Sequence, residues 1–167
     1  MEGEHAPVAF RPHAGDYLTP SGAKARFDAN VDAIRVANRL ASEGRPATPD
    51  EQVILSRFSS WGAVPDVFDE SKANWSTERS LLQSILSEEA YSQARRTTIN
   101  AHYTDTAYVE AIWSTMRTLG FQGGTVLEPG AGSGTFIGMA PVDARMVGVE
   151  LDQTSATIAA ALYPGAE

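Results

Sequence analysis

Three alternate glycines directly follow a short apolar run, and this segment most constrains how the chain folds. Residues Thr125–Phe136 read Thr-Val-Leu-Glu-Pro-Gly-Ala-Gly-Ser-Gly-Thr-Phe. The apolar run is typical of a buried strand. Glycine adopts backbone conformations that other residues avoid, and it lets a ligand approach the bare main chain. The segment therefore predicts a buried strand that ends in a tight turn with a ligand resting on its backbone.

A second acid, Glu150, follows Glu128 at the sequence separation that nucleoside-binding domains show. Glu150 lies 22 residues after Glu128 and ends another apolar run, Met146–Glu150. Two strand ends, a glycine turn and a second acid in this order are the layout of a nucleoside-binding α/β half-domain. A glycine turn alone is more often only a turn, and Glu150 alone would be a solvated acid. Their combination with the flanking strands and a helix start at Phe136 favours a ligand site.

The glycine spacing indicates which nucleoside. A dinucleotide site usually shows Gly-x-Gly-x-x-Gly facing a pyrophosphate, whereas this chain has Glu-Pro-Gly-x-Gly-x-Gly. An acid before the first glycine would repel a pyrophosphate but would pair with an ammonium group. S-adenosyl-L-methionine carries an α-amino group, a ribose diol and an adenine. It is the expected cofactor, with Glu150 accepting hydrogen bonds from the ribose hydroxyls.

A helix is expected just before the glycine segment. Thr104 or Asp105 is suited to cap its N-terminus, and Gly120 is suited to end it. Its N-terminus could receive the carboxylate of the methionine. The apolar stripe consists of Val109, Ile112, Trp113, Met116 and Leu119.

The order of these motifs resembles a known family. His-Tyr-Thr-Asp (102–105), a helix, Leu-Glu-Pro-Gly-x-Gly-x-Gly-x-Phe (127–136) and Val-Gly-Val-Glu-Leu-Asp (147–152) resemble the N6-adenine DNA methyltransferases. The narrower resemblance is to very large proteins of bacteria, phages and plasmids that join such an enzyme to an SNF2-type helicase. Segments 58–68, 88–104 and 157–166 support it, and it runs from about Ser21 to the C-terminus.

The resemblance implies roles for individual residues. Tyr103 and Thr104 would contact the methionine end, Glu150 would hold the ribose, and Leu151 would pack on the adenine. Asp152 is instead expected to cap a helix over Gln153–Leu162. The implied cofactor pocket consists of Tyr103, Thr104, Glu128, Pro129, Gly130, Gly132, Gly134, Phe136, Glu150 and Leu151.

The chain departs from the family in one respect. The family uses an Asn/Asp-Pro-Pro-Tyr/Phe segment to bind the flipped adenine, and this segment does not occur in the sequence. No catalytic residue is therefore predicted. We expect a truncated chain whose partners would be the remainder of the methyltransferase–helicase polypeptide and, through it, DNA.

Composition excludes several other functions. The formal net charge is −8 and the pI is near 4.8, which argues against a nucleic-acid surface on this chain, because duplex binding depends on Lys and Arg. The absence of cysteine excludes disulfides and thiol chemistry. The histidines lack metal-ligand spacing, so no metal is expected. No signal peptide or membrane-length apolar run occurs, and a cytoplasmic location without a membrane partner is expected.

The first half predicts helices joined by loops. After an irregular arm over residues 1–20, helices are expected over 21–42, from Thr48, from a cap at Ser76 and from Ser87. A loop is expected at Trp61–Pro65. On the first helix, the apolar face is predicted to consist of Phe27, Val31, Ile34 and Ala41.

Together these features predict an α/β chain with two parts. A helical N-terminal module (1–97) precedes the truncated opening of a Rossmann-like, class I S-adenosylmethionine-dependent methyltransferase domain (98–167). The expected function is that of an N-terminal fragment of an adenine-specific DNA methyltransferase. The residues leave two alternatives open: an inactive cofactor-binding or interaction module, and a methyltransferase acting on RNA or a small molecule. Two strands with free edges also predict self-association.

Overall fold

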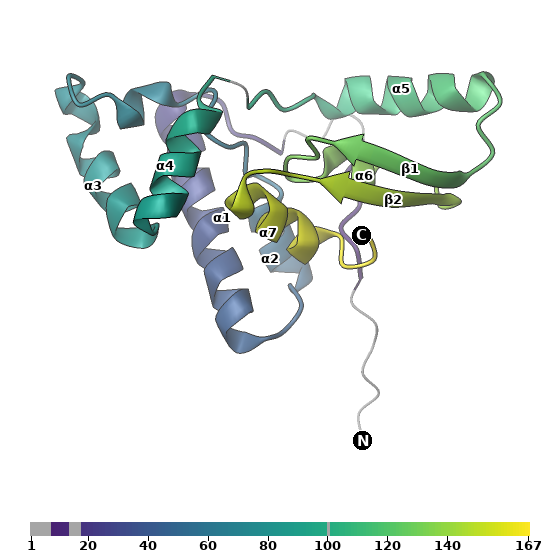
Figure 1. Cartoon of the computed structure of the whole chain (residues 1–167), viewed down its shortest axis with the longest axis horizontal. Helices are drawn as coiled ribbons and strands as arrows, with labels where there is room; N and C mark the ends of the chain where they lie inside the picture. Colours follow the sequence, from purple (N-terminus) through teal and green to yellow (C-terminus); the bar gives the residue numbers. More distant parts are fainter. Residues whose placement is uncertain (1–7, 14–17, 100) are drawn as a thin grey trace.

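The chain forms a mixed α/β structure, seen here in a computed structural model that describes residues 8–13, 18–99 and 101–167. The expected arm over residues 1–20 thus lies partly outside the described residues. Figure 1 shows the N-terminal helices gathered on one side and a small sheet with its own helix on the other. The helices are α1 (Ala23–Glu43), α2 (Pro49–Leu55), α3 (Ser76–Ile85), α4 (Glu88–Thr97), α5 (Thr106–Thr118), α6 (Thr135–Gly138) and α7 (Gln153–Leu162), with 3-10 segments η1 (Pro65–Phe68) and η2 (Ala73–Trp75).

Capping side chains set the starts of several helices as the sequence predicts. The Thr48 hydroxyl accepts a hydrogen bond from the Glu51 backbone N–H, and the Glu51 carboxylate accepts one from the Thr48 N–H, which confirms the capping box of α2. Ser87 caps α4 by accepting from Ala90. The cap predicted at Ser76 is wrong by one residue: Ser76 is the first residue of α3, and Trp75 holds the cap position without a side-chain bond.

A core of aromatic and aliphatic side chains joins the N-terminal helices. Phe27 of α1 packs tilted against Trp61 and edge-on against Trp75, and all three are buried. Ile158 and Leu162 of α7 belong to the same buried cluster. The last helix therefore packs on the first ones, and this core runs across the boundary expected at residue 97.

The apolar face of α1 differs from the prediction at one position. Phe27, Val31 and Ile34 are buried, whereas Ala41 is exposed and Leu40 is buried in its place. Val36 and Ala37 are buried too, and Leu40 follows them by four and three residues, as a period of 3.6 residues allows.

The helix α5 covers the sheet with a narrow stripe. Asp105 caps it by accepting from the Ala107 N–H, as expected. Val109 and Trp113 are buried against the sheet. Ile112 and Leu119, predicted on the same stripe, are exposed, because α5 contacts the sheet along one helical row only.

The two predicted strands form one parallel pair, but the prediction that the first is buried is wrong, because every residue of β1 is exposed or half-buried. β1 (Gly124–Pro129) pairs with β2 (Ala144–Val149), in register from Gly124 with Ala144 to Pro129 with Val149. The second strand ends before Glu150 and Leu151, which lie in the connection to α7. Because parallel strands end at the same edge of the sheet, Glu128 near the end of β1 and Glu150 just after β2 lie on the same side of the cavity. Among the described residues, none of the helices has the length and apolar character to span a bilayer.

Replacing Gly134 by alanine should destabilise the fold strongly. Gly134 has φ +86°, and an added Cβ would lie 2.7 Å from the Tyr163 ring. Left-handed strain and overpacking together should cost about 2–5 kcal/mol of unfolding free energy, measured by urea denaturation.

Gly44→Ala is the matched control. Gly44 also has a left-handed backbone, with φ 62° and ψ 32°, but a Cβ there meets nothing within 4 Å. Its cost should be only about 1–2 kcal/mol. Equal losses for the two variants would show that the Tyr163 contact contributes nothing.

The free edge of β1 should make the isolated chain self-associate. β1 pairs with β2 along one edge, and no described strand pairs with its other edge. The outer edge of β2 is partly covered, because Glu167 exchanges backbone hydrogen bonds with Met146 and Gly148. Static light scattering should show a mass that rises with concentration, and Thr125→Lys, which places a charge on β1, should lower it.

The same charge introduced by Thr118→Lys on α5 should leave the mass unchanged. A monomer at every concentration would contradict the prediction.

Candidate functional site

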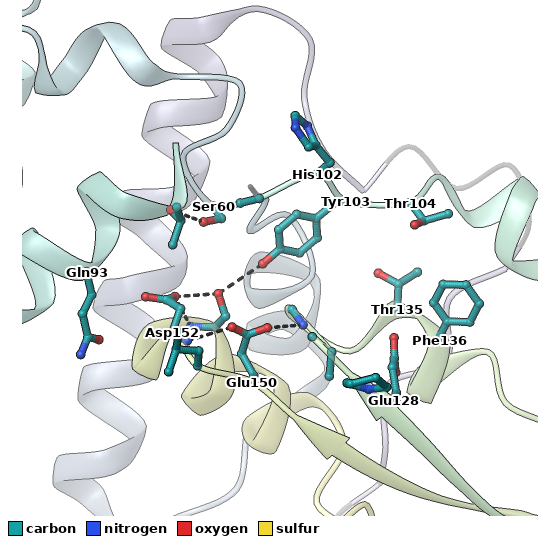
Figure 2. Close-up of a pocket in the computed structure, with 18 of the residues that line it drawn as sticks. Ser60, Gln93, His102, Tyr103, Thr104, Glu128, Thr135, Phe136, Glu150 and Asp152 are labelled. Carbon is teal, nitrogen blue, oxygen red and sulfur yellow. Dashed lines mark hydrogen bonds between the residues drawn. The ribbon is translucent and has the colours of Figure 1, made fainter. Parts of the chain in front are cut away.

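A cavity of about 680 Å³ opens at the carboxyl ends of the two strands. Figure 2 shows it between the glycine turn on one side and α4 with the segment 101–104 on the other. The sheet side is lined by Leu127, Glu128, Pro129, Gly130, Ala131, Gly132, Thr135, Phe136, Glu150, Leu151, Asp152 and Ser155, and the helical side by Ser60, Gln93, Arg96, Thr97, Ala101, His102, Tyr103 and Thr104.

The structure brings together all the predicted site residues except Gly134. Tyr103, Thr104, Pro129, Phe136 and the others line this one cavity. Gly134 does not, because it faces the Tyr163 ring behind the turn. The lack of a side chain at Gly134 makes room for the Tyr163 ring. The spacing of the glycines in the sequence could not show that Gly134 serves packing while the other glycines line the cavity. Leu151 lies at the rim and is 94% exposed.

The glycine turn is bonded to the end of β2. The backbone N–H groups of Gly130 and Ala131 both donate to the Val149 carbonyl, at 2.7 and 3.0 Å. Gly130 has φ +79°, and a Cβ there would meet open space. The turn therefore keeps glycine for its backbone conformation and leaves its main chain accessible from the cavity.

Glu150 holds the turn and the next helix in place. Its Oε2 accepts from the Gly132 N–H at 2.7 Å, and its Oε1 accepts from the Asp152 N–H at 2.8 Å. A carboxylate has about four lone-pair sites. Each oxygen of Glu150 therefore keeps capacity for one further donor, such as a hydroxyl of a ligand in the cavity.

Glu128 is a half-buried carboxylate without an internal partner. Its Oε2 is buried and accepts no hydrogen bond. Burial, followed by the negative charge of Glu150, raises the pKa of Glu128 from its ordinary value of 4.5 to about 7. Unpaired buried carboxylates are costly in folded proteins. This side chain is suited to a proton at low pH or to a cationic donor in the cavity.

Tyr103 connects the helical core to the cavity floor. Its hydroxyl lies 3.3 Å from the Ser155 hydroxyl, its ring packs edge-on against Phe58, and a Cβ on Gly132 would come within 3.3 Å of the ring. Burial raises the pKa of Tyr103 to about 12, so the phenol stays protonated at neutral pH.

Asp152 has the role that the sequence predicts. It caps α7, whose observed bounds are those expected, by accepting from the Ser155 N–H at 2.8 Å and the Ser155 hydroxyl at 2.7 Å. It also lines the cavity. Among the described residues, no group of acids and histidines is arranged to hold a metal ion.

Sequence reasoning missed the wall that α4 contributes. Gln93, Arg96 and Thr97 line the cavity from this helix. Arg96 is exposed at the last turn of α4 and also borders the cavity. The spacing i, i+3, i+4 places these residues on one helical face, and this spacing is the signal that could have found them.

Comparison with known proteins gives one distant relative. Over 139 residues the chain is 33% identical to "Defense against restriction protein B" of Escherichia phage P1, and the match covers 83% of this chain but 5% of that protein. The chain thus spans a small part of the relative it matches. No family model matches the chain. No solved structure matches it either.

This relative corrects the family suggested by the motifs. The assignment to N6-adenine DNA methyltransferases joined to SNF2-type helicases is wrong, because the relative is named for defence against restriction. The associated description of a helicase-linked protein that methylates adenine in DNA with S-adenosylmethionine has no support from the relative. The glycine turn misled because many nucleoside sites need the same backbone.

Glu128→Gln should change how stability depends on pH. The pKa of Glu128 is higher in the folded chain than its ordinary value. The stability that its neutral form gives is therefore fully present below about pH 4.5 and is lost as the pH rises through about 7. The amide stays neutral, so the variant should gain about 1–3 kcal/mol over the wild type between about pH 4 and pH 8, measured by urea denaturation.

Glu110→Gln controls for the change in net charge. Glu110 is exposed on α5, and its variant should follow the wild type across the same range. Parallel curves for wild type and Glu128→Gln would mean that Glu128 carries no penalty in the folded chain.

Proposed function

We propose that this chain is a nucleoside-binding module that holds S-adenosylmethionine within a protein acting in defence against restriction. The observation that carries the ligand is the buried, unpaired Oε2 of Glu128 in a cavity floored by bare glycine backbone. The biological setting is supported by the phage P1 relative. The match covers only 5% of that relative, so its name supports a setting in defence against restriction but no particular activity for this chain.

The cavity residues fit the ligand from one end to the other. The ammonium group of the methionine end would supply the donor that Glu128 lacks. The ribose hydroxyls would use the spare capacity of the Glu150 oxygens. The cavity volume of about 680 Å³ lies within the range of small-molecule sites, roughly 300–1,000 Å³.

The proposed architecture is the opening of a Rossmann-like domain. Two parallel strands, a glycine turn after the first and a helix after the second support it. Ligands of such folds bind outside the carboxyl ends of the strands, where this cavity lies. We propose binding of the nucleoside and assign no catalytic residue.

An interaction module is the second candidate. The free edge of β1 and the exposed side chain of Leu127, at 61%, favour pairing with a further chain segment. This candidate does not account for the unpaired Glu128 carboxylate inside the cavity, so we place it second.

Calorimetry with two ligands should test the proposed function. S-adenosylhomocysteine has the ammonium group, whereas 5′-methylthioadenosine shares the adenosine and the thioether but lacks the amino acid. Glu128→Gln should weaken the binding of S-adenosylhomocysteine by about tenfold, because a charge-assisted hydrogen bond becomes a neutral one. The affinity of the Glu128→Gln variant for methylthioadenosine should equal that of the wild type.

Two results would contradict the proposal. Binding of NADH without binding of either adenosyl ligand would show that the ligand is a dinucleotide. If Glu128→Gln loses affinity equally for both ligands, Glu128 supports the fold of the cavity and does not contact the ammonium group. Glu110→Gln again serves as the charge control.

A further inference from the structure

The helix α4 presents two polar side chains to the cavity that form no hydrogen bond with any described residue. Gln93 and Arg96, one turn apart, line the cavity. Thr97 beside them is occupied, since its hydroxyl bonds the Ala94 carbonyl at 2.8 Å and lies 3.1 Å from the Ser60 hydroxyl. In the described part of the chain, the Gln93 amide takes part in no hydrogen bond, although the residue is half-buried. A free amide facing a cavity is suited to a ligand group.

Gln93 lies at the end of the cavity where the base of the proposed ligand would be. Figure 2 shows Gln93 on the side of the cavity where Asp152 and Glu150 stand, away from Glu128. With the ribose at Glu150 and the ammonium at Glu128, the base extends toward the side of Asp152 and α4. The Oδ2 of Asp152 already accepts two hydrogen bonds from Ser155. Gln93 is thus the uncommitted amide at the base end.

We infer that Gln93 reads the adenine base and makes the site specific for adenine nucleosides. The inference rests on the proposed function and extends it to a wall outside the glycine motif. A carboxamide offers one acceptor and two donors. Its oxygen accepts from the exocyclic amine of adenine while its nitrogen donates to a neighbouring ring nitrogen, the pairing that amides make with adenine edges.

Arg96 cannot replace Gln93 in this role. The guanidinium has only donors, so it cannot accept a hydrogen bond from the exocyclic amine. It is the one Arg or Lys among the described residues that line the cavity. A contribution from Arg96 would therefore fall on ring nitrogens or on other acceptors of the ligand and would not depend on the amine.

A cycle of two proteins and two ligands tests the inference. Calorimetry would measure S-adenosylhomocysteine and its analogue in which hydrogen replaces the 6-amino group, with wild type and Gln93→Ala. In the wild type, loss of the amine should weaken binding by roughly threefold to tenfold, the value of one hydrogen bond. In Gln93→Ala, the two ligands should bind equally well. Gln83→Ala, at an exposed site on α3 away from the cavity, should behave as the wild type.

Each other outcome overturns a defined statement. If loss of the amine weakens binding equally in wild type and Gln93→Ala, Gln93 does not read the base, while the proposed function stands. If the wild type binds neither ligand and thermal melting shows that it is folded, the proposed function fails and this inference fails with it.

Discussion

The hydrogen bonds between the glycine turn and the end of β2 are the constraint on which the site depends. Gly130 and Ala131 donate to the Val149 carbonyl, and Gly132 donates to Glu150. These bonds fix a turn that lacks side chains over most of its length. They also tie Glu150, just after β2, to the turn that follows Glu128 at the end of β1.

The free protein keeps a polar group that its own fold does not satisfy. Folding normally pairs buried carboxylates, yet the Glu128 Oε2 has no partner and the pKa of this side chain is raised. The chain offers cations elsewhere: Arg39 and Arg45 both pair with Glu51. The buried Glu51 is thus paired within the fold, whereas Glu128 is left without a partner, and this contrast is what supports the proposal of a cationic ligand group at Glu128.

The sequence predicted the parts of the fold that depend on local chemistry. Caps at Thr48, Ser87, Asp105 and Asp152 followed from side chains that bond the nearest backbone N–H groups. The Ser76 cap failed locally by one residue, and the other failures depended on contacts between distant segments. Gly134 faces Tyr163, and α4 closes the cavity from a segment to which the sequence assigned no ligand contact. The family resemblance failed for a related reason, since a turn shared by many proteins specifies a backbone and not an activity.

The two walls of the cavity come from segments that the core has already joined. Tyr103 packs against the N-terminal core, and α7, which follows the glycine turn and β2, belongs to that core. The position of α4 relative to the strand ends is thus maintained by packing, without a ligand. A ligand that met the carboxylate of Glu128 at one end and the amide of Gln93 at the other would satisfy groups that each wall leaves open. Such a ligand would bind the folded chain but not the unfolded one, and so it would stabilise the fold by mass action. That stabilisation would offset the cost of leaving polar groups on both walls without partners in the free protein.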